Sequence, residues 1–247
     1  MSPRSIHGLG RRFAPDSRDL LHPMAAMLPG PTAPLPTKKT WNFRGAVLDQ
    51  GRTQTCTAHA AAHFYRAQPI QHRRDINPYD LYREGVLLDE WKQNDIEATY
   101  PDSKLQWGSS GRGMVKALEA RGLIQEYAWA TTLREATEWV LTRGPVLIGT
   151  NWYRDFELPT REGFVTFKTQ KGGGVAGGHE TLLRGVDTTK GIALVVNSWG
   201  PGWNSGKAKK CPKGHFLISF EDLERLFHED GDAVSPIEKR VSKKKPK

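Results

Sequence analysis

The order of helix-like and strand-like patterns is the feature that most constrains this chain. Helical patterns predominate in the first half and start at residues 56–67 (CTAHAAAHFYRA), an Ala-rich stretch without Gly or Pro. Short β-branched and aromatic runs, bounded by Gly or Pro, follow at 145–152, 191–199 and 214–220. Because helices and strands do not alternate, we expect an α+β fold rather than a parallel α/β sheet. A helical N-terminal lobe would pack against a β-rich C-terminal lobe, with a cleft between them.

Local signals define the other expected helices. Thr132 and Glu135 form a capping box before an apolar run, and Gly122 is placed to end the preceding helix. The further helices are expected at 77–91, 112–121, 132–144 and 221–227.

Both ends of the chain differ from its middle. Residues 1–40 contain PGPTAPLP, whose prolines favour an extended chain, so we expect an N-terminal arm there. One folded domain is expected at 41–234, followed by a basic C-terminal tail at 235–247. The arm offers apolar and charged side chains that could anchor it on the body: Phe13, Leu20, Leu21, Arg11, Arg12, Asp16, Arg18 and Asp19.

The net charge of +9 is concentrated in two short stretches. Residues 239–247 hold six basic residues and no acidic one, and 207–213 hold four more. Without these ten cations the rest of the chain is close to neutral, which disfavours a folded nucleic-acid-binding face. The tail is expected to be a solvated end, and weak contact with nucleic acid or an acidic partner is the alternative.

Composition excludes several classes of protein. With 37% hydrophobic residues and eight Trp, the chain has enough to bury and is not disordered as a whole. No run approaches the ~18 apolar residues of a membrane helix, so we expect no membrane partner. Two cysteines and no apolar leader favour a reducing, cytoplasmic setting. Cys211 has no Cys or His at ligand spacing, and we expect no metal, no cofactor and a monomer.

Cys56 is the first candidate for chemistry. It opens the Ala-rich helix, where the positive end of the helix dipole favours thiolate over thiol. A lone cysteine is more often buried and inert, so this position alone does not establish a nucleophile.

A histidine near Cys56 could take its proton, and three compete for this role. His59 and His63 lie three and seven residues after Cys56, on the same helix. A neighbour on that helix cannot easily reach over its N-terminus, so we favour His179, which begins a strand-like run after two glycines. Asn197, at the end of another strand-like run, could hold the imidazole in one tautomer, with Trp199 covering that bond.

The order Gln50, Cys56, His179, Asn197 resembles the papain-like cysteine peptidases, over about residues 35–227. DQGRTQTCTAHA, GGHETLLRGVD and VVNSWGPGWNSG are similar to the segments that carry the family's site, and Thr-Ala after the cysteine resembles its bacterial and phage branch. The resemblance implies that Cys56 is the nucleophile and that His179 is the general base and then the acid. It implies that Asn197 orients His179 and that Gln50 completes an oxyanion hole with the backbone N–H of Cys56.

The resemblance also implies where a peptide substrate binds. A Gly-rich stretch of the family pairs with the substrate backbone, and its counterpart here is Gly108, Ser109 and Ser110; Gly178 would line the cleft beside His179. Glu180 departs from the family, where a small apolar residue is common; on a strand it should point away from Cys56. The implied activity is hydrolysis of peptide bonds in a peptide or protein substrate.

Two alternatives remain at this stage. The chain could bind peptides without cleaving them, although a binding module has no need of all four site residues. It could also be a cell-wall peptide amidase, but the Asn-Ser-Trp-Gly ending argues against that class. Family propeptides are usually long helical domains, so we expect residues 1–36 to be a permanent arm, which could overlap part of the cleft.

Overall fold

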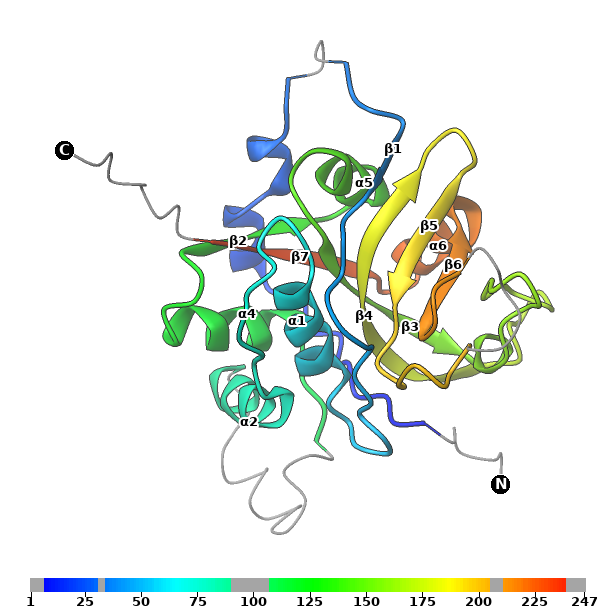
Figure 1. Ribbon diagram of the computed structural model, residues 1–247, viewed down its shortest axis with the longest axis horizontal. Helices are drawn as coiled ribbons and strands as arrows, with labels where there is room; N and C mark the ends of the chain where they lie inside the picture. The colour runs from blue at the N-terminus through cyan, green and yellow to red at the C-terminus, as the bar shows by residue number, and fades with distance from the viewer. Residues whose placement is uncertain (1–6, 31–33, 90–106, 205–210, 239–247) are drawn as a thin grey trace.

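A computed structural model describes residues 7–30, 34–89, 107–204 and 211–238 (Figure 1). Within these ranges one sheet runs in the order β2-β7-β3-β4-β5-β6, with β1 paired to β4, and every strand pairing is antiparallel. The strands are β1 (Lys38–Thr40), β2 (Glu126–Ala130), β3 (Val146–Tyr153), β4 (Val175–Asp187), β5 (Ile192–Val196), β6 (His215–Ser219) and β7 (Asp232–Ile237).

The helices lie in two groups. α1, α2 and α4 pack against one another, and α5 and α6 lie apart from them (Figure 1). Their bounds are α1 (Cys56–Arg66), α2 (Pro78–Leu88), α4 (Gly111–Ala120), α5 (Leu133–Thr142) and α6 (Phe220–His228); short 3-10 helices span η1 (Ser17–Leu21), η2 (Met24–Met27) and η3 (Arg154–Glu157). The expected α+β architecture, helices first and antiparallel strands later, is confirmed.

Each group of helices covers its own face of the sheet. On β3, Leu147 belongs to the apolar cluster formed with α1, α2 and α4, whereas Val146 and Ile148 belong to the cluster formed with α5 and α6. This separation follows from the alternation of side chains along a strand. Because α1 packs directly on β4, the start of α1 lies against the middle of that strand.

Local signals placed several elements correctly, and one domain boundary incorrectly. The capping box of Thr132 and Glu135 starts α5, and Asn77 caps α2 with Pro78 in its first turn. The boundary expected after residue 234 is wrong, because β7 continues to Ile237 and Ser235 is buried within it. Residues 239–247 and 205–210 lie outside the described part of the chain.

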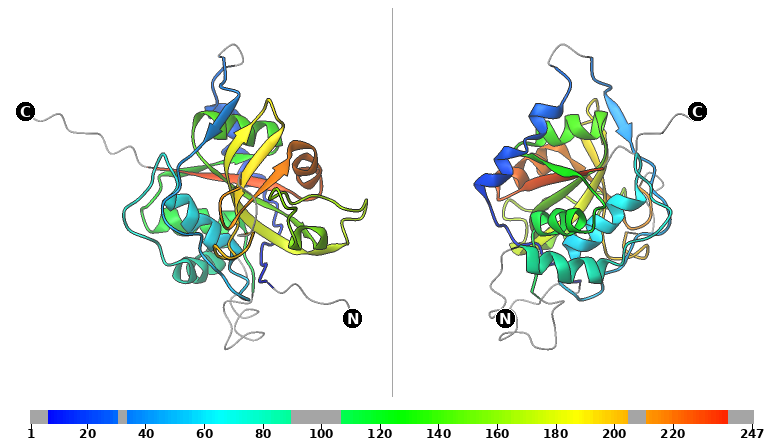
Figure 2. Two further views of the ribbon diagram at one scale, coloured as in Figure 1. Left: turned by 45° about the vertical axis from the view of Figure 1, so that its right-hand side comes forward. Right: turned by 90° about the vertical axis from the view of Figure 1, so that its left-hand side faces the viewer.

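From residue 7 the N-terminal arm runs along the body to the two 3-10 helices beside β2 and α5 (Figures 1 and 2). The expected apolar anchors are wrong: Phe13, Leu20 and Leu21 are exposed by 46%, 62% and 75%. The turn of η1 points Leu20 and Leu21 outward and buries Asp19, which pairs with Arg112 at 2.9 Å; Met24 is fully buried.

Candidate active site

Cys56 lies at the first position of α1 and is completely buried. Its Sγ accepts a hydrogen bond from the backbone N–H of Glu180, 3.4 Å away on β4. The packing of α1 on β4 therefore brings Cys56 beside His179, the residue that precedes Glu180.

His179 and Asn197 are joined directly. β4 pairs with β5, and Asn197 follows the last residue of β5, so its side chain reaches the ring of His179. The Nε2 atom of His179 lies 2.8 Å from Oδ1 of Asn197. Since an amide oxygen only accepts, Nε2 carries the proton, and Nδ1 is left without a hydrogen bond to any described residue. Nδ1 is thus the nitrogen that can take up a proton.

Aromatic rings enclose the histidine. The ring of Trp199 stacks on His179 with centroids 4.9 Å apart, and Trp152 meets His179 edge to face at the same distance. These contacts exclude water from the bond between His179 and Asn197, as expected for Trp199.

Gln50 lies at the start of the loop that leads to Cys56. Its Oε1 accepts a hydrogen bond from the hydroxyl of Ser198, and its Nε2 donates to the carbonyl of Thr53 at 2.7 Å and to that of Leu9 at 3.1 Å. Ser198 was not predicted from the sequence; its only signal is that it stands between Asn197 and Trp199. Gln50 therefore presents an amide N–H to a carbonyl of the arm.

The rival histidines are held elsewhere. His59 Nδ1 lies 2.9 Å from the carbonyl of Thr55, and His63 Nε2 accepts from the backbone N–H of Leu48 at 2.9 Å. Burial lowers the pKa of His59 to about 4 and that of His63 well below its ordinary value. Both act as neutral partners of backbone groups.

The arm crosses this site as an extended peptide. The N–H groups of Gly10 and Arg11 donate to the carbonyl of Gly178, each at 3.0 Å. Ser109 donates to the carbonyl of Gly10 at 2.9 Å and accepts from the N–H of Arg12 at 2.8 Å. Of the expected peptide-binding residues, Ser109 and Gly178 thus pair with peptide backbone.

The other two expected binding residues contribute differently. A Cβ atom on Gly108 would lie 2.7 Å from the carbonyl oxygen of Gly10, so only glycine permits this approach. Ser110 instead caps α4 and donates its hydroxyl to Asp89, away from the arm. Asp89, which also accepts from the N–H of Ser110 and the hydroxyl of Ser109, was missed because its partners are distant in sequence.

Burial keeps the thiol and the imidazole neutral. It raises the pKa of Cys56 to about 12, against the opposing effect of the Glu180 N–H, and lowers the pKa of His179 to about 4, against the opposing hydrogen bond from Asn197. The arm pairs with Gly178 and Ser109 beside these groups, so it does overlap the cleft, as the sequence analysis allowed. That residues 1–36 are a permanent arm stays a prediction. The favourable helix dipole at Cys56 is outweighed here by the loss of water.

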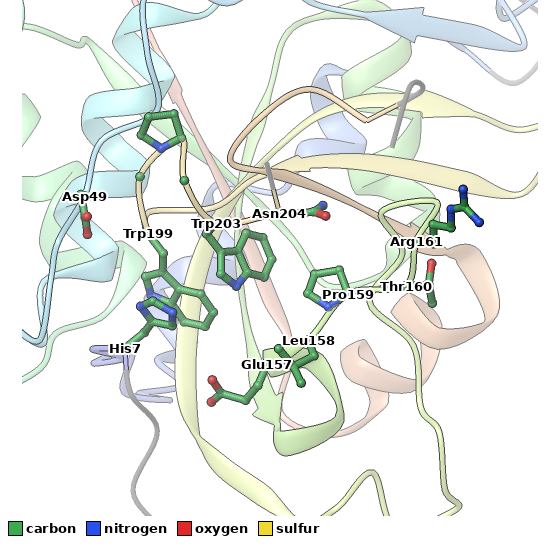
Figure 3. Close-up of a pocket in the computed structure, with 13 residues that line it drawn as sticks. His7, Asp49, Glu157, Leu158, Pro159, Thr160, Arg161, Trp199, Trp203 and Asn204 are labelled. Atoms are coloured by element: carbon green, nitrogen blue, oxygen red, sulfur yellow. The ribbon is translucent and has the colours of Figure 1, made fainter. Parts of the chain in front are cut away.

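A cavity of about 650 Å³ adjoins the site on the outer side of Trp199 (Figure 3). His7 of the arm stacks on Trp199 with centroids 4.5 Å apart and forms one edge of this cavity. Leu158 and Pro159 lie on its opposite side, and Trp203 lies between (Figure 3).

The described part of the chain holds neither a metal-ligand cluster nor a membrane-spanning helix. No group of three or more His, Cys, Asp or Glu side chains there is arranged to hold a metal ion, and Cys211 is a free, buried thiol. No helix in those ranges is long and apolar enough to cross a membrane.

Comparison with known proteins identifies the fold. No protein-family model matches the chain, and no curated protein matches it by sequence. Among solved structures, it is similar to xylellain, a cysteine protease from Xylella fastidiosa, with 17% identity and a TM-score of 0.62 over 97% of this chain and 99% of that one. It is also similar to procathepsin L2 from the larval midgut of Tenebrio molitor, with 16% identity and a TM-score of 0.60 over 96% of this chain and 76% of that one.

Proposed function

We propose that this chain, which has the fold of the papain-like cysteine proteases, is a cysteine peptidase that hydrolyses peptide bonds through Cys56 and His179. One observation carries the proposal: a peptide segment of the arm pairs with Gly178, the residue before His179, with its Leu9 carbonyl 3.1 Å from the Gln50 amide. A site that holds peptide backbone beside a thiol and an imidazole is suited to attack on a peptide carbonyl.

The chemistry begins when a substrate replaces the arm. His179 Nδ1 takes the proton of Cys56, and the imidazolium–thiolate pair forms at the N-terminus of α1. The thiolate attacks the carbonyl carbon, and the negative charge on oxygen is stabilised by the Gln50 amide and the backbone N–H of Cys56. Asn197 holds the ring in the tautomer that this transfer requires.

Collapse of this intermediate completes the first half of the reaction. The C–N bond breaks, His179 Nδ1 gives its proton to the leaving amine, and the acyl group remains on Cys56 as a thioester. A water molecule then loses a proton to His179 and attacks the thioester, which releases the carboxylic acid and restores the thiol.

A peptide-binding domain that does not cleave is the second candidate. The observation that favours it is the neutral, fully buried Cys56 and His179 beneath a bound segment of the same chain. The two candidates differ in whether displacement of the arm yields turnover. We further infer that the protein acts as a monomer in the cytoplasm, and that any contact of the basic tail with nucleic acid or an acidic partner is weak.

Hydrolysis of a peptide library by the full-length protein, with a thiol present, tests the proposal. Cleavage should be abolished by Cys56→Ala and retained by Cys211→Ala, which removes the other thiol. Equal activity of the Cys56→Ala protein would refute the cysteine mechanism, and binding without cleavage by the wild type would favour the second candidate.

A further inference from the structure

The side chain of Arg11 enters the body beside the active site. Only 1% of it is exposed, although it belongs to the arm. Its guanidinium donates to Oδ2 of Asp232 at 2.6 Å and to the carbonyl of Asp230 at 2.7 Å. A cation is buried at this depth only where carboxylates compensate it.

The pocket that the Arg11 side chain enters also contains carboxylate oxygens that do not bond to Arg11. Glu180 is fully buried, and neither of its carboxylate oxygens has a hydrogen-bond partner among the described residues; the same holds for Oδ1 of Asp232. Burial raises the pKa of both carboxyl groups, and Arg11 opposes this rise. Arg11 is thus a cation that favours the ionised form of both groups against the effect of burial.

Glycines create the space that the guanidinium fills. A Cβ atom on Gly149 would lie 2.4 Å from Oδ1 of Asp232, 2.6 Å from Nε of Arg11 and 2.8 Å from Oε2 of Glu180. A Cβ atom on Gly111 would lie 2.8 Å from Oε1 of Glu180. Any larger residue at these two positions would displace the carboxylates or shorten the pocket.

The neighbouring cation of the body is committed to other carboxylates. Arg112 lies 2.9 Å from Asp19 and 3.7 Å from Asp89. Arg112 also lowers the pKa of Asp232 through space, but its ion pairs among the described residues are with Asp16, Asp19 and Asp89. The cation in direct contact with Asp232 comes from outside the body, as the Arg11 side chain does.

We propose that Glu180 and Asp232 form a specificity pocket for a cationic side chain, Arg or Lys, of the substrate. This inference rests on the proposed function. The Leu9 carbonyl meets Gln50 and the Arg11 side chain fills the pocket, so the selected residue lies within two positions of the bond that is cleaved. Arg11 is the chain's own occupant of this pocket.

Binding tests the pocket without requiring catalysis. Calorimetry measures binding to the full-length Arg11→Ala protein. Acetyl-arginine amide should bind, and its uncharged isostere acetyl-citrulline amide should bind at least about 10-fold more weakly. Glu180→Gln and Asp232→Asn on this background should each weaken binding of the arginine compound by about 10-fold. The exposed Glu162→Gln serves as the matched control and should leave binding unchanged.

If the Arg11→Ala protein fails to fold, Arg11→Met keeps the aliphatic length of the side chain without its charge. Equal binding of the arginine and citrulline compounds by a folded Arg11 variant would overturn the proposal.

A peptide library cleaved by the same full-length variant separates the two proposals. If the cleaved peptides are enriched in Arg or Lys within two residues of the cleaved bond, and Glu180→Gln abolishes this enrichment, both the peptidase and the pocket are supported. Cleavage with an apolar preference at those positions would overturn the pocket and leave the peptidase intact. Arginine-selective binding without any cleavage would support the pocket and refute the peptidase.

Discussion

The two cysteines of this chain occupy different environments. Cys56 begins a helix, accepts a hydrogen bond from the backbone of β4 and is fully buried, whereas Cys211 is 7% exposed, with its pKa raised by burial to about 11. We expect iodoacetamide to label Cys56 slowly in the closed protein and faster than Cys211 once the arm is displaced, because only Cys56 then has a base and a helix N-terminus beside it. Mass mapping of the labelled cysteines measures both rates, and faster labelling of Cys211 in the open protein would contradict the assignment.

Replacement of His179 and replacement of Asn197 should lower kcat/KM to different extents. His179→Ala removes the group that moves the proton and should lower kcat/KM by about 1,000-fold or more. Asn197→Ala removes only the partner of Nε2 and should cost about 10- to 100-fold, because the ring remains between Trp199 and Trp152. Steady-state kinetics on one peptide compares them, and a complete loss in His59→Ala or His63→Ala would identify a different base.

Buried His179 also couples stability to pH. Its ordinary pKa of 6.5 falls to about 4 in the folded protein, so the unfolded chain binds a proton first as the pH drops. Acid therefore destabilises the wild type through this group, and His179→Gln removes that penalty. Between pH 7.5 and 4.5 the free energy of unfolding of the variant should gain about 2–3 kcal/mol relative to the wild type. Urea unfolding at the two pH values measures it, and an unchanged difference would show that His179 titrates normally.

At the scale of elements, the arm controls access to Cys56. Gly10 has φ +125°, and a Cβ atom there would lie 2.2 Å from the carbonyl oxygen of Gln54. Gly10→Val should therefore unseat the arm and raise the labelling rate of Cys56 by about 10-fold or more. Gly30→Ala, in the same arm with open space around it, is the control and should leave the rate unchanged. An equal rate in wild type and Gly10→Val would show that the arm does not shield the thiol.

The sequence predicted those elements whose signals are local. The capping box of α5 and the Ala-rich α1 could be read directly because both depend on neighbouring residues. β7 was missed because Pro236 within DAVSPI argues against a strand, although it lies opposite Tyr127 of β2. The spacing of Gln50, Cys56, His179 and Asn197 indicated which residues the fold brings together. For the arm it allowed an overlap with the cleft, but not the particular pairing with Gly178 and Ser109.

The role of Glu180 shows where sequence reasoning reaches its limit. Alternation along β4 predicted that its side chain points away from Cys56 but not which residues it meets, and these are Gly111 and Gly149. Its proximity to Asp232 depends on the pairing of β3 with both β4 and β7. No local pattern reports such a pairing, so the acidic pocket could only be found in the structure.

At the scale of the whole molecule, β7 separates a dispensable tail from a required strand. Truncation after Glu238 keeps β7 and the contact of Glu238 with His72, and should leave the melting temperature and peptide kinetics unchanged. Truncation after Val234 removes half of the strand that joins β2 to β3 and should lower the melting temperature by several degrees or prevent folding. Calorimetry compares the two. Equal melting temperatures of the two truncated proteins would show that β7 adds no stability after Val234.

Any salt-sensitive binding of nucleic acid by the tail should disappear in both truncated proteins.

The covalent connection of the arm to the body sets the effective concentration of Arg11 at its pocket. Asp19 and Met24 fix the arm eight and thirteen residues beyond Arg11, so Arg11 meets its pocket as an intramolecular ligand. Short tethers of this kind give effective concentrations of roughly millimolar or above. Dilution of the protein therefore does not open the site, opening follows first-order kinetics, and a free peptide must reach a comparable concentration, or bind more tightly than the arm, before it enters.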